Sequence, residues 1–292
     1  MSAGLNAEIN PAMDEASVIA FSGQILGELQ SGELVLPMLP EVTLKVSDMA
    51  SDPDASLADL ADVIVTDVTL SSQLVKVSNS PLYRGRESVD SVQVAVTRLG
   101  FKIVKNLVSS MAMQQMFQTS SPRTEKLLRS MWELNVDVSA RSQLLAVRVP
   151  AVQVDEAMLA GLIYNIGVLP LLAKADQQPE LFEDEATLQL LIDKLSAPIG
   201  LAVLESWDFP QQLVSVVEHH SDFERDVASE PDLVDIIQVA SLQSHLNPQH
   251  DYTPEQLAAL PAFRKLGIQT EVEVDELDEN SAEYAEAMAL FA

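Results

Sequence analysis

Apolar side chains recur at helical spacing along most of the chain. Three clear stripes lie at 42–49, 57–64 and 233–240, where apolar residues are three, four or seven positions apart. This spacing puts the apolar side chains on one face of a helix and the polar ones on the other. Each stripe must be buried against another helix, so the pattern predicts an all-α fold built as a compact bundle.

Several predicted helices begin with a capping signature. Ser56 precedes a helix that has Asp59 in its first turn, where a carboxylate favours the positive end of the helix dipole. Ser121 places a hydroxyl before Pro122, a residue that suits the first helical turn. Thr253 is followed by a proline and, three residues on, by a glutamine, which is the pattern of a capping box.

Proline and glycine divide the chain into regions. A proline-rich break at 36–40 precedes the first strong stripe, Gly100 separates two helical segments, and 119–122 joins two helical halves. Because this last break is short, we expect two lobes of one unit. Beyond Gly267 we expect a loosely attached acidic segment. The predicted organisation is an N-terminal helical extension (1–35), a main domain (36–246, with lobes 36–119 and 122–246) and a C-terminal acidic extension (247–292).

The composition bounds the chemistry and the compartment. Hydrophobic residues make up 47% of the 292 residues and aromatic residues only 5%, so the core must be mostly aliphatic. The absence of cysteine excludes a disulfide framework, a thiolate metal site and a cysteine nucleophile. Residues 1–15 lack the pattern of a signal peptide, and no uninterrupted apolar run approaches the roughly 18 residues of a membrane helix. We therefore expect a cytoplasmic protein that does not bind membranes.

The net charge is −27, from 17 basic and 44 acidic residues, and it repels nucleic acids and anionic membranes. We therefore expect no nucleic-acid partner. The charge is uneven, since 76–148 holds 11 basic and five acidic residues, whereas 271–292 holds eight acidic residues and no basic one. These segments attract each other, mark a face for an acidic partner, or are ordinary solvated surface, and the sequence leaves the three alternatives open.

Four ordered motifs in the first half of the chain carry a family resemblance. They are Leu-Pro-Met-Leu-Pro-Glu-Val at 36–42, Ser-Asp-Pro-Asp-Ala-Ser-Leu-Ala-Asp-Leu-Ala at 51–61, Thr-Asp-Val-Thr-Leu-Ser-Ser-Gln-Leu-Val-Lys-Val-Ser-Asn-Ser-Pro-Leu-Tyr at 66–83, and Ala-Val-Thr-Arg-Leu-Gly at 95–100. In this order they resemble the HDOD family, a degenerate relative of HD-type metal-dependent phosphohydrolases. Weaker similarity continues at 160–167, 207–210 and 218–220. The resemblance implies an HD-like helical core with an N-terminal helical lobe.

The same resemblance locates a metal site that this sequence does not complete. In active HD enzymes the metal is held by a His, an adjacent His-Asp pair and a later Asp, with further His in some subgroups. The matching positions here are Leu134, Tyr164, Asn165, Ser196 and Ser241. None supplies an imidazole or a charged oxygen, which a hydrolytic metal requires. The resemblance therefore implies no metal, no cofactor and no catalytic residue.

Two adjacent histidines do not rebuild this site. On a helix, the side chains of His219 and His220 diverge by roughly 100° and rarely share one ion. The altered site is either a cleft that binds a nucleotide or a partner side chain, or a space that its own side chains close. Its predicted residues are Trp132, Leu134, Tyr164, Asn165, Ser196, His219, His220 and Ser241.

Basic residues of the first lobe form a second candidate surface. Arg98, Lys102 and Lys105 are spaced by four and three, which puts them on one face of a continuous helix. Alternatively, Gly100 breaks that helix and the three residues share no face. If they do share a face, it either binds an acidic protein surface or a phosphate, or it is an ordinary solvated helix face. The complete candidate set is Arg84, Arg86, Arg98, Lys102 and Lys105.

Two functions are consistent with these observations. The first is a non-catalytic signal-transduction module that acts by binding a protein partner or a small ligand, because the resemblance implies the output or scaffold role of HDOD proteins in bacterial signalling. The alternative is a divergent metal-dependent phosphohydrolase that acts on a nucleotide or another phosphoester. A nucleotide ligand and a homo-oligomer remain open in the first interpretation.

Overall fold

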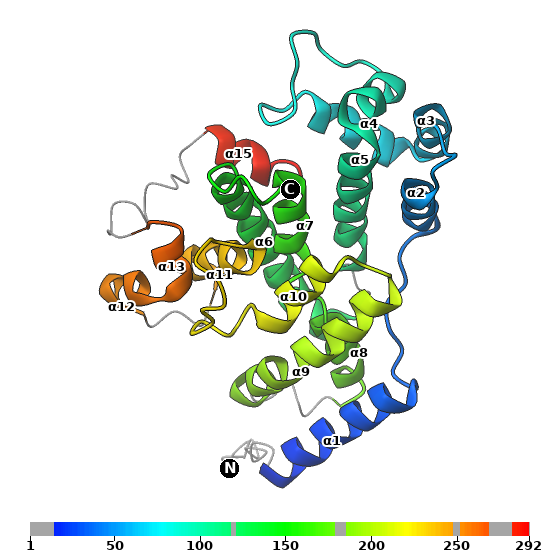
Figure 1. Ribbon diagram of the computed structural model, residues 1–292. Coiled ribbons are helices and arrows are strands. Elements are labelled where there is room, and N and C mark those ends of the chain that lie inside the picture. The colour runs from blue at the N-terminus through cyan, green and yellow to red at the C-terminus, as the bar shows by residue number, and fades with distance from the viewer. Residues whose placement is uncertain (1–14, 118–120, 179–184, 248–251, 269–281, 292) are drawn as a thin grey trace, which may run out of the picture.

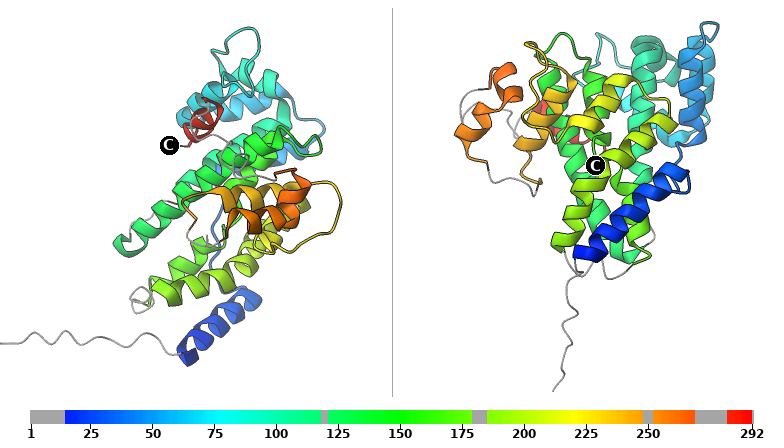
Figure 2. Two further views of the ribbon diagram at one scale, coloured as in Figure 1. Left: turned by 90° about the vertical axis from the view of Figure 1, so that its left-hand side faces the viewer. Right: turned by 60° about the horizontal axis from the view of Figure 1, so that its bottom comes forward.

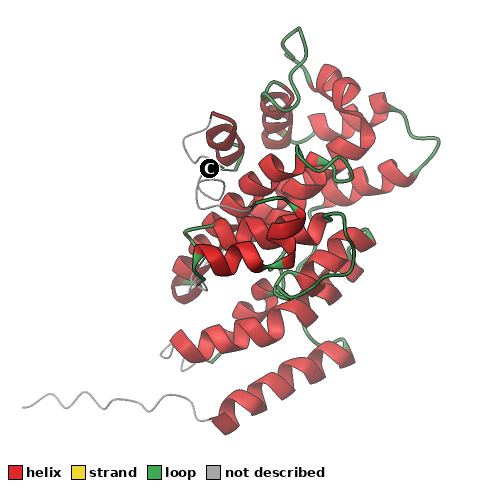
Figure 3. Cartoon of the chain, turned by 60° about the vertical axis from the view of Figure 1, so that its left-hand side comes forward, coloured by secondary structure: helices red, strands yellow, loops and turns green. Residues whose placement is uncertain are grey.

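The computed structural model describes residues 15–117, 121–178, 185–247, 252–268 and 282–291. Within these ranges the regular elements are all helices, with no strand (Figures 1 and 3). The predicted all-α class is confirmed. The helices pack around one continuous apolar core that runs through both halves of the chain.

The first half forms a four-helix lobe in which the long helix α5 supports the other three. The four helices are α2 (Glu41–Ser51), α3 (Leu57–Val65), α4 (Val68–Ser78) and α5 (Val92–Met116). The predicted stripes are the buried faces here, since Val46, Leu60 and Ile64 are all fully buried. Each of α2, α3 and α4 packs against α5.

Helix α5 changes direction at Gly100. This glycine has φ 75° and ψ 170°, so it interrupts the helical backbone between Val92 and Met116. A side chain at this φ would be strained, which explains why glycine serves here. The break confirms that Gly100 separates two helical segments, and it directs the second half of α5 toward the next lobe.

The second half forms the larger lobe. Its helices are α6 (Pro122–Ala146), α7 (Val154–Ile163), α8 (Val168–Ala175), α9 (Glu185–Ser206), α10 (Gln211–His219) and α11 (Leu233–Gln243). Helix α6 packs against α7 and α11, while α9 packs against α8 and α10. Helix α7 also contacts α5, and this contact joins the two lobes.

The N-terminal extension packs on this second lobe as helix α1 (Glu15–Ser31), which lies along α9 (Figures 1 and 2). Phe21 and Ile25 are buried there, and Glu28 pairs with Lys174 at 2.7 Å. The helix is therefore an integral part of the bundle.

Two of the three predicted helix caps are confirmed, and the third is wrong in one detail. Ser56 and Thr253 both form complete capping boxes. Pro122 occupies the first turn of α6 as expected, but the hydroxyl of Ser121 makes no capping bond to that helix. It donates instead to Asp176 Oδ1 at 2.7 Å, which ties the start of α6 to the end of α8.

The C-terminal segment is more firmly attached than we expected. Helices α12 (Pro254–Ala259) and α13 (Pro261–Lys265) follow α11, and α13 packs on α11. Helix α15 (Ala282–Met288) packs on α6, and Phe291 beyond it is only 2% exposed. The expectation of a loosely attached segment is wrong at its end, because apolar residues anchor it.

Two helical stretches of this bundle are long and apolar enough to cross a membrane, which the sequence analysis did not anticipate. They are 154–175 and 186–206, and 89% and 56% of an apolar 18-residue window in each is buried inside the fold. The core helices of a soluble protein pass the same test of length and composition.

Candidate functional site

The predicted metal region lies where α6 crosses α7. The helices approach so closely that a Cβ on Gly161 would lie 2.5 Å from Ser139 Cα. Ser139 Oγ also donates to the carbonyl oxygen of Met158 at 2.9 Å, from one helix to the other. Glycine at 161 permits this close crossing, which brings polar side chains of α6 against the end of α7.

An amide pair occupies the centre of this crossing. The Asn135 side-chain nitrogen donates to Asn165 Oδ1 at 2.9 Å and to the Leu162 carbonyl oxygen at 3.0 Å. Both asparagines are buried. The family resemblance predicts Leu134 as the α6 residue of this site, but the side chain that contacts Asn165 belongs to the next residue, Asn135. The sequence comparison misses Asn135 because a shift of one residue in the alignment moves the predicted position to another face of α6.

Tyr164 is buried beside the amide pair. Burial and the negative charge of Asp137 raise the pKa of its hydroxyl group, and a hydrogen bond with Asn165 offsets part of that shift. The phenol therefore stays protonated and neutral at physiological pH. Neither it nor the two amides brings a negative charge to the crossing.

A buried ion pair follows one turn further along α6. Arg141 Nε lies 2.9 Å from Asp137 Oδ1, and both side chains are 3% exposed. Tyr284 of α15 donates a hydrogen bond to the same carboxylate oxygen. Arg141 also lies over the Tyr284 ring, 5.5 Å from its centroid. The spacing of four residues between Asp137 and Arg141 is visible in the sequence. Their contact with Tyr284, which lies 147 residues after Asp137, has no local sequence signal.

The two histidines point to different surroundings, as their adjacency predicted. The ring of His220 meets that of Tyr164 edge-on at 5.1 Å between centroids, and its Nδ1 lies 3.1 Å from the Val217 carbonyl oxygen. Desolvation lowers the pKa of His220. His219 is more exposed, with its Nε2 3.6 Å from a carboxylate oxygen of Glu218. Only His220 belongs to the crossing.

The remaining predicted residues have separate structural roles. Trp132 packs between Phe117, at 5.5 Å, and Phe291, at 6.2 Å. Ser196 is buried at the α8–α9 contact, where its carbonyl oxygen leaves no room for a Cβ on Gly167. Ser241 Oγ donates to a carbonyl oxygen of its own helix, α11. The contacts of these three residues are with other parts of the core, so they do not join the amide pair in one site.

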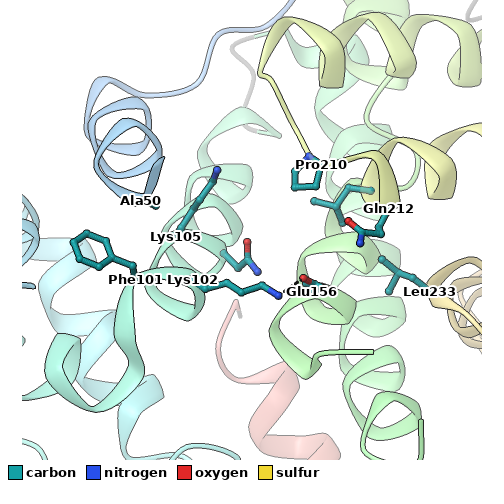
Figure 4. Close-up of a pocket in the computed structure, with 10 residues that line it drawn as sticks. Ala50, Phe101, Lys102, Lys105, Glu156, Pro210, Gln212 and Leu233 are labelled. Carbon is teal, nitrogen blue, oxygen red and sulfur yellow. Dashed lines mark ion pairs between the residues drawn. The ribbon is translucent and has the colours of Figure 1, made fainter. Parts of the chain in front are cut away.

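A pocket of about 280 Å³ lies elsewhere, between the two lobes (Figure 4). Its walls come from α2, α5 and α7 and from the N-terminal ends of α10 and α11. At its edge, Asn106 donates to Asp155 at 2.6 Å, and Lys102 pairs with Glu156 at 2.7 Å. The lining residues are Ala50, Phe101, Lys102, Lys105, Asn106, Glu156, Pro210, Gln212, Leu213 and Leu233.

The predicted basic surface is divided among three places. Lys102 and Lys105 line the pocket. Arg98 precedes the break at Gly100 and donates to the carbonyl oxygens of Ser78, at 3.3 Å, and Glu87, at 2.6 Å. A shared face for all three is therefore wrong, because the helix does not continue. Arg84 and Arg86 are exposed in the segment between α4 and α5.

Residues 36–223 match the HDOD domain, and this is more than half of the chain. The chain belongs to the HDOD domain family. The match contains the whole first lobe, the amide pair and the interlobe pocket except for Leu233. The site geometry described above is therefore that of an HDOD protein.

Comparison with individual proteins gives the same relationship. A solved structure from Shewanella amazonensis SB2B, described as "Putative metal-dependent phosphohydrolase", is 30% identical, with a TM-score of 0.84 over 95% of this chain and all of that one. An HDOD domain protein of unknown function from Geobacter sulfurreducens is 19% identical, with a TM-score of 0.63 over 95% and 98% of the two chains. An uncharacterized protein from Treponema pallidum is 24% identical over 199 residues, which is 63% of this chain and 37% of that protein.

The donors at the crossing do not fit the metal that HD-type phosphohydrolases hold. Asn165 Oδ1 accepts from Asn135, and the Asp137 carboxylate is paired with Arg141 and Tyr284. Asn135 Oδ1 is buried with no hydrogen-bond donor in the described part of the chain, but one neutral oxygen does not hold a hydrolytic ion. Across the described ranges, no three His, Asp or Glu side chains are grouped to bind a metal.

Proposed function

We propose that this HDOD protein is a non-catalytic signal-transduction module that acts by binding. The observation that carries the proposal is the Asn135–Asn165 hydrogen bond, which fills the crossing with neutral amides that bind each other. A metal that activates water needs imidazole or carboxylate ligands at that place. Without them, the fold retains a helical scaffold with surfaces for partners, which is the role that the family resemblance implies.

The proposal includes a protein partner and a cytoplasmic location. The exposed Arg84 and Arg86 offer a basic surface in a protein of net charge −27, so an acidic protein surface is the complementary partner chemistry. The acidic end of the chain does return to the basic region, but through Tyr284 and a carbonyl oxygen that accepts from Lys76. That contact leaves both arginines exposed.

A second candidate is metal-dependent phosphohydrolysis. It is favoured by the 30% identity to a protein whose description carries that activity. It requires a metal at the crossing, and the donors there would have to be Asn135, Asn165 and Tyr164. Neutral amide oxygens and a protonated phenol bind such ions weakly.

Metal analysis and a phosphodiesterase assay on the same preparation separate the two candidates. The 292-residue chain purified without chelators should contain far less than stoichiometric iron, manganese or zinc and should not hydrolyse a chromogenic phosphodiester. The proposal would be overturned by stoichiometric metal and turnover that are both lost in Asn165→Ala but kept in Lys126→Ala. Lys126 is an exposed residue of α6 and serves as the matched surface control.

A further inference from the structure

We propose that the interlobe pocket binds a small organic phosphate. The pocket has a volume of about 280 Å³, enough for a small ligand, and both lobes contribute to its walls. It is separate from the α6–α7 crossing, because it shares no lining residue with the amide pair. This inference deepens the proposed function and rests on it, since the phosphate would be the input of a regulatory module.

Lys105 carries the argument for a negatively charged ligand. It lines the pocket and is half-buried, and no ion pair or hydrogen bond joins it to any described residue. Figure 4 shows its amine directed into the space between α2 and Pro210, away from Glu156. Other lysines without an anionic partner among the described residues, such as Lys126 and Lys194, are exposed to solvent, whereas Lys105 is half-buried in the wall of a pocket.

Lys102 supplies a second positive charge at the same opening. Its ammonium pairs with Glu156 at 2.7 Å, but the lysine side chain is 66% exposed. Glu156 is only 22% exposed, but an ammonium group has three N–H donors, so Lys102 can donate to a ligand while it keeps its pair with Glu156. The two amines together suit a phosphate, which carries up to two negative charges near neutral pH.

The start of α10 adds polar hydrogen-bond donors to this charge. Pro210 precedes the helix and makes no side-chain cap, and Gln212 of the first turn lines the pocket. Backbone N–H groups of an uncapped first turn favour an anion. The start of α11 differs, because Asp232 caps it and pairs with Arg225 at 2.6 Å. The anion is therefore expected beside α10 and Lys105.

Apolar side chains on the remaining walls determine what is attached to the phosphate. Phe101, Leu213 and Leu233 line the pocket together with Ala50 and Pro210. These surfaces do not favour a bare ion, which needs polar ligands on all sides, but they can bury a ring or a hydrocarbon. A phosphomonoester with one ring, such as a nucleoside monophosphate, meets both requirements.

The test uses the 292-residue chain, with AMP, inorganic phosphate and adenosine as probes in isothermal titration calorimetry. We expect AMP to bind, inorganic phosphate to bind more weakly, and adenosine not to bind measurably. Lys105→Ala should weaken AMP binding about tenfold or more, the loss of one charge-assisted hydrogen bond. Lys126→Ala removes an equal charge from an exposed part of α6 and should leave the affinity unchanged.

Protein NMR distinguishes a lost ligand contact from a folding defect. The chemical-shift changes caused by AMP should concentrate at 101–106 and 210–213. Without ligand, the spectrum of Lys105→Ala should match that of the wild type for residues away from position 105. The inference fails if neither AMP nor phosphate binds, if adenosine binds as well as AMP, or if Lys105→Ala binds normally. None of these results would show that a metal binds at Asn165. The proposed non-catalytic function would therefore stand even if this inference failed.

Discussion

The side-chain nitrogen of Asn135 lies 2.9 Å from Asn165 Oδ1, and this contact joins α6 to the end of α7 at their closest crossing. Asn165 Oδ1 already accepts from an amide N–H, so this oxygen does not need an ion as its partner. The contact thus has a structural role at the place where relatives of this fold would carry chemistry. Its removal should be measurable as lost stability.

Asn165→Ala should lower the free energy of unfolding by about 1–3 kcal/mol, because the buried Asn135 amide loses one of its two acceptors and keeps only the Leu162 carbonyl oxygen. Urea denaturation followed by circular dichroism measures this change. Lys126→Ala, on the exposed face of α6, should change stability by less than about 0.5 kcal/mol. Equal stability of the Asn165→Ala and wild-type proteins would show that the amide bond is dispensable.

Gly161→Ala should destabilise the protein by several kcal/mol, since the new Cβ would lie 2.5 Å from the Ser139 backbone. Gly23→Ala is the matched control, because nothing lies within 4 Å of a Cβ at that exposed helical position. It should stabilise α1 by about 0.5–1 kcal/mol. Thermal unfolding of both variants should therefore shift in opposite directions, and a shift of the same sign would contradict the close crossing.

Tyr284→Phe should cost about 1–3 kcal/mol, because the buried Asp137 carboxylate loses a hydrogen-bond donor. Tyr252→Phe removes the same hydroxyl from a tyrosine that is 39% exposed and should be nearly neutral. Chemical denaturation of the two variants provides the comparison. If both behave like the wild type, α15 does not contribute to the stability of α6.

His220 should make stability depend on pH in mildly acidic solution. Desolvation lowers the pKa of its ring below the usual 6.5, so the unfolded chain binds more protons than the folded one just below that pH. The stability contribution is complete above 6.5 and is lost as the pH falls from 6.5 through the folded-state pKa.

The measurement for His220 is the free energy of unfolding from about pH 5 to 7. The difference between the wild type and His220→Gln should grow as the pH rises across this window and then become constant. His219→Gln removes the more exposed neighbouring ring and should follow the wild-type profile. A constant difference across the whole window would exclude His220 as the titrating group.

Local features of the fold were predictable from the sequence, and contacts between distant segments were not. The stripe at 57–64 and the caps at Ser56 and Thr253 depend on neighbouring residues, so the sequence contains their full signal. Gly100 was identified as a break for the same reason. Ser121 was misassigned because its acceptor, Asp176, lies on another helix.

The candidate site was predictable in chemistry and less so in geometry. Asn165 and Tyr164 were identified because glycines flank them in sequence, whereas Asn135 could only be recognised once α6 and α7 were placed together. The pocket around Lys105 has walls from five helices of both lobes, and no local pattern encodes such an arrangement.

The segment around α15 is bonded to helices that lie far earlier in the sequence. The carbonyl oxygen of Ala289 accepts from Lys76 Nζ at 2.6 Å, and that of Phe291 accepts from Gln114 at 3.2 Å. These bonds join residues that are 213 and 177 positions apart. Contacts at such separation carry a large cost in loop-closure entropy, so we expect them to form late in folding, after the helices that hold Lys76 and Gln114.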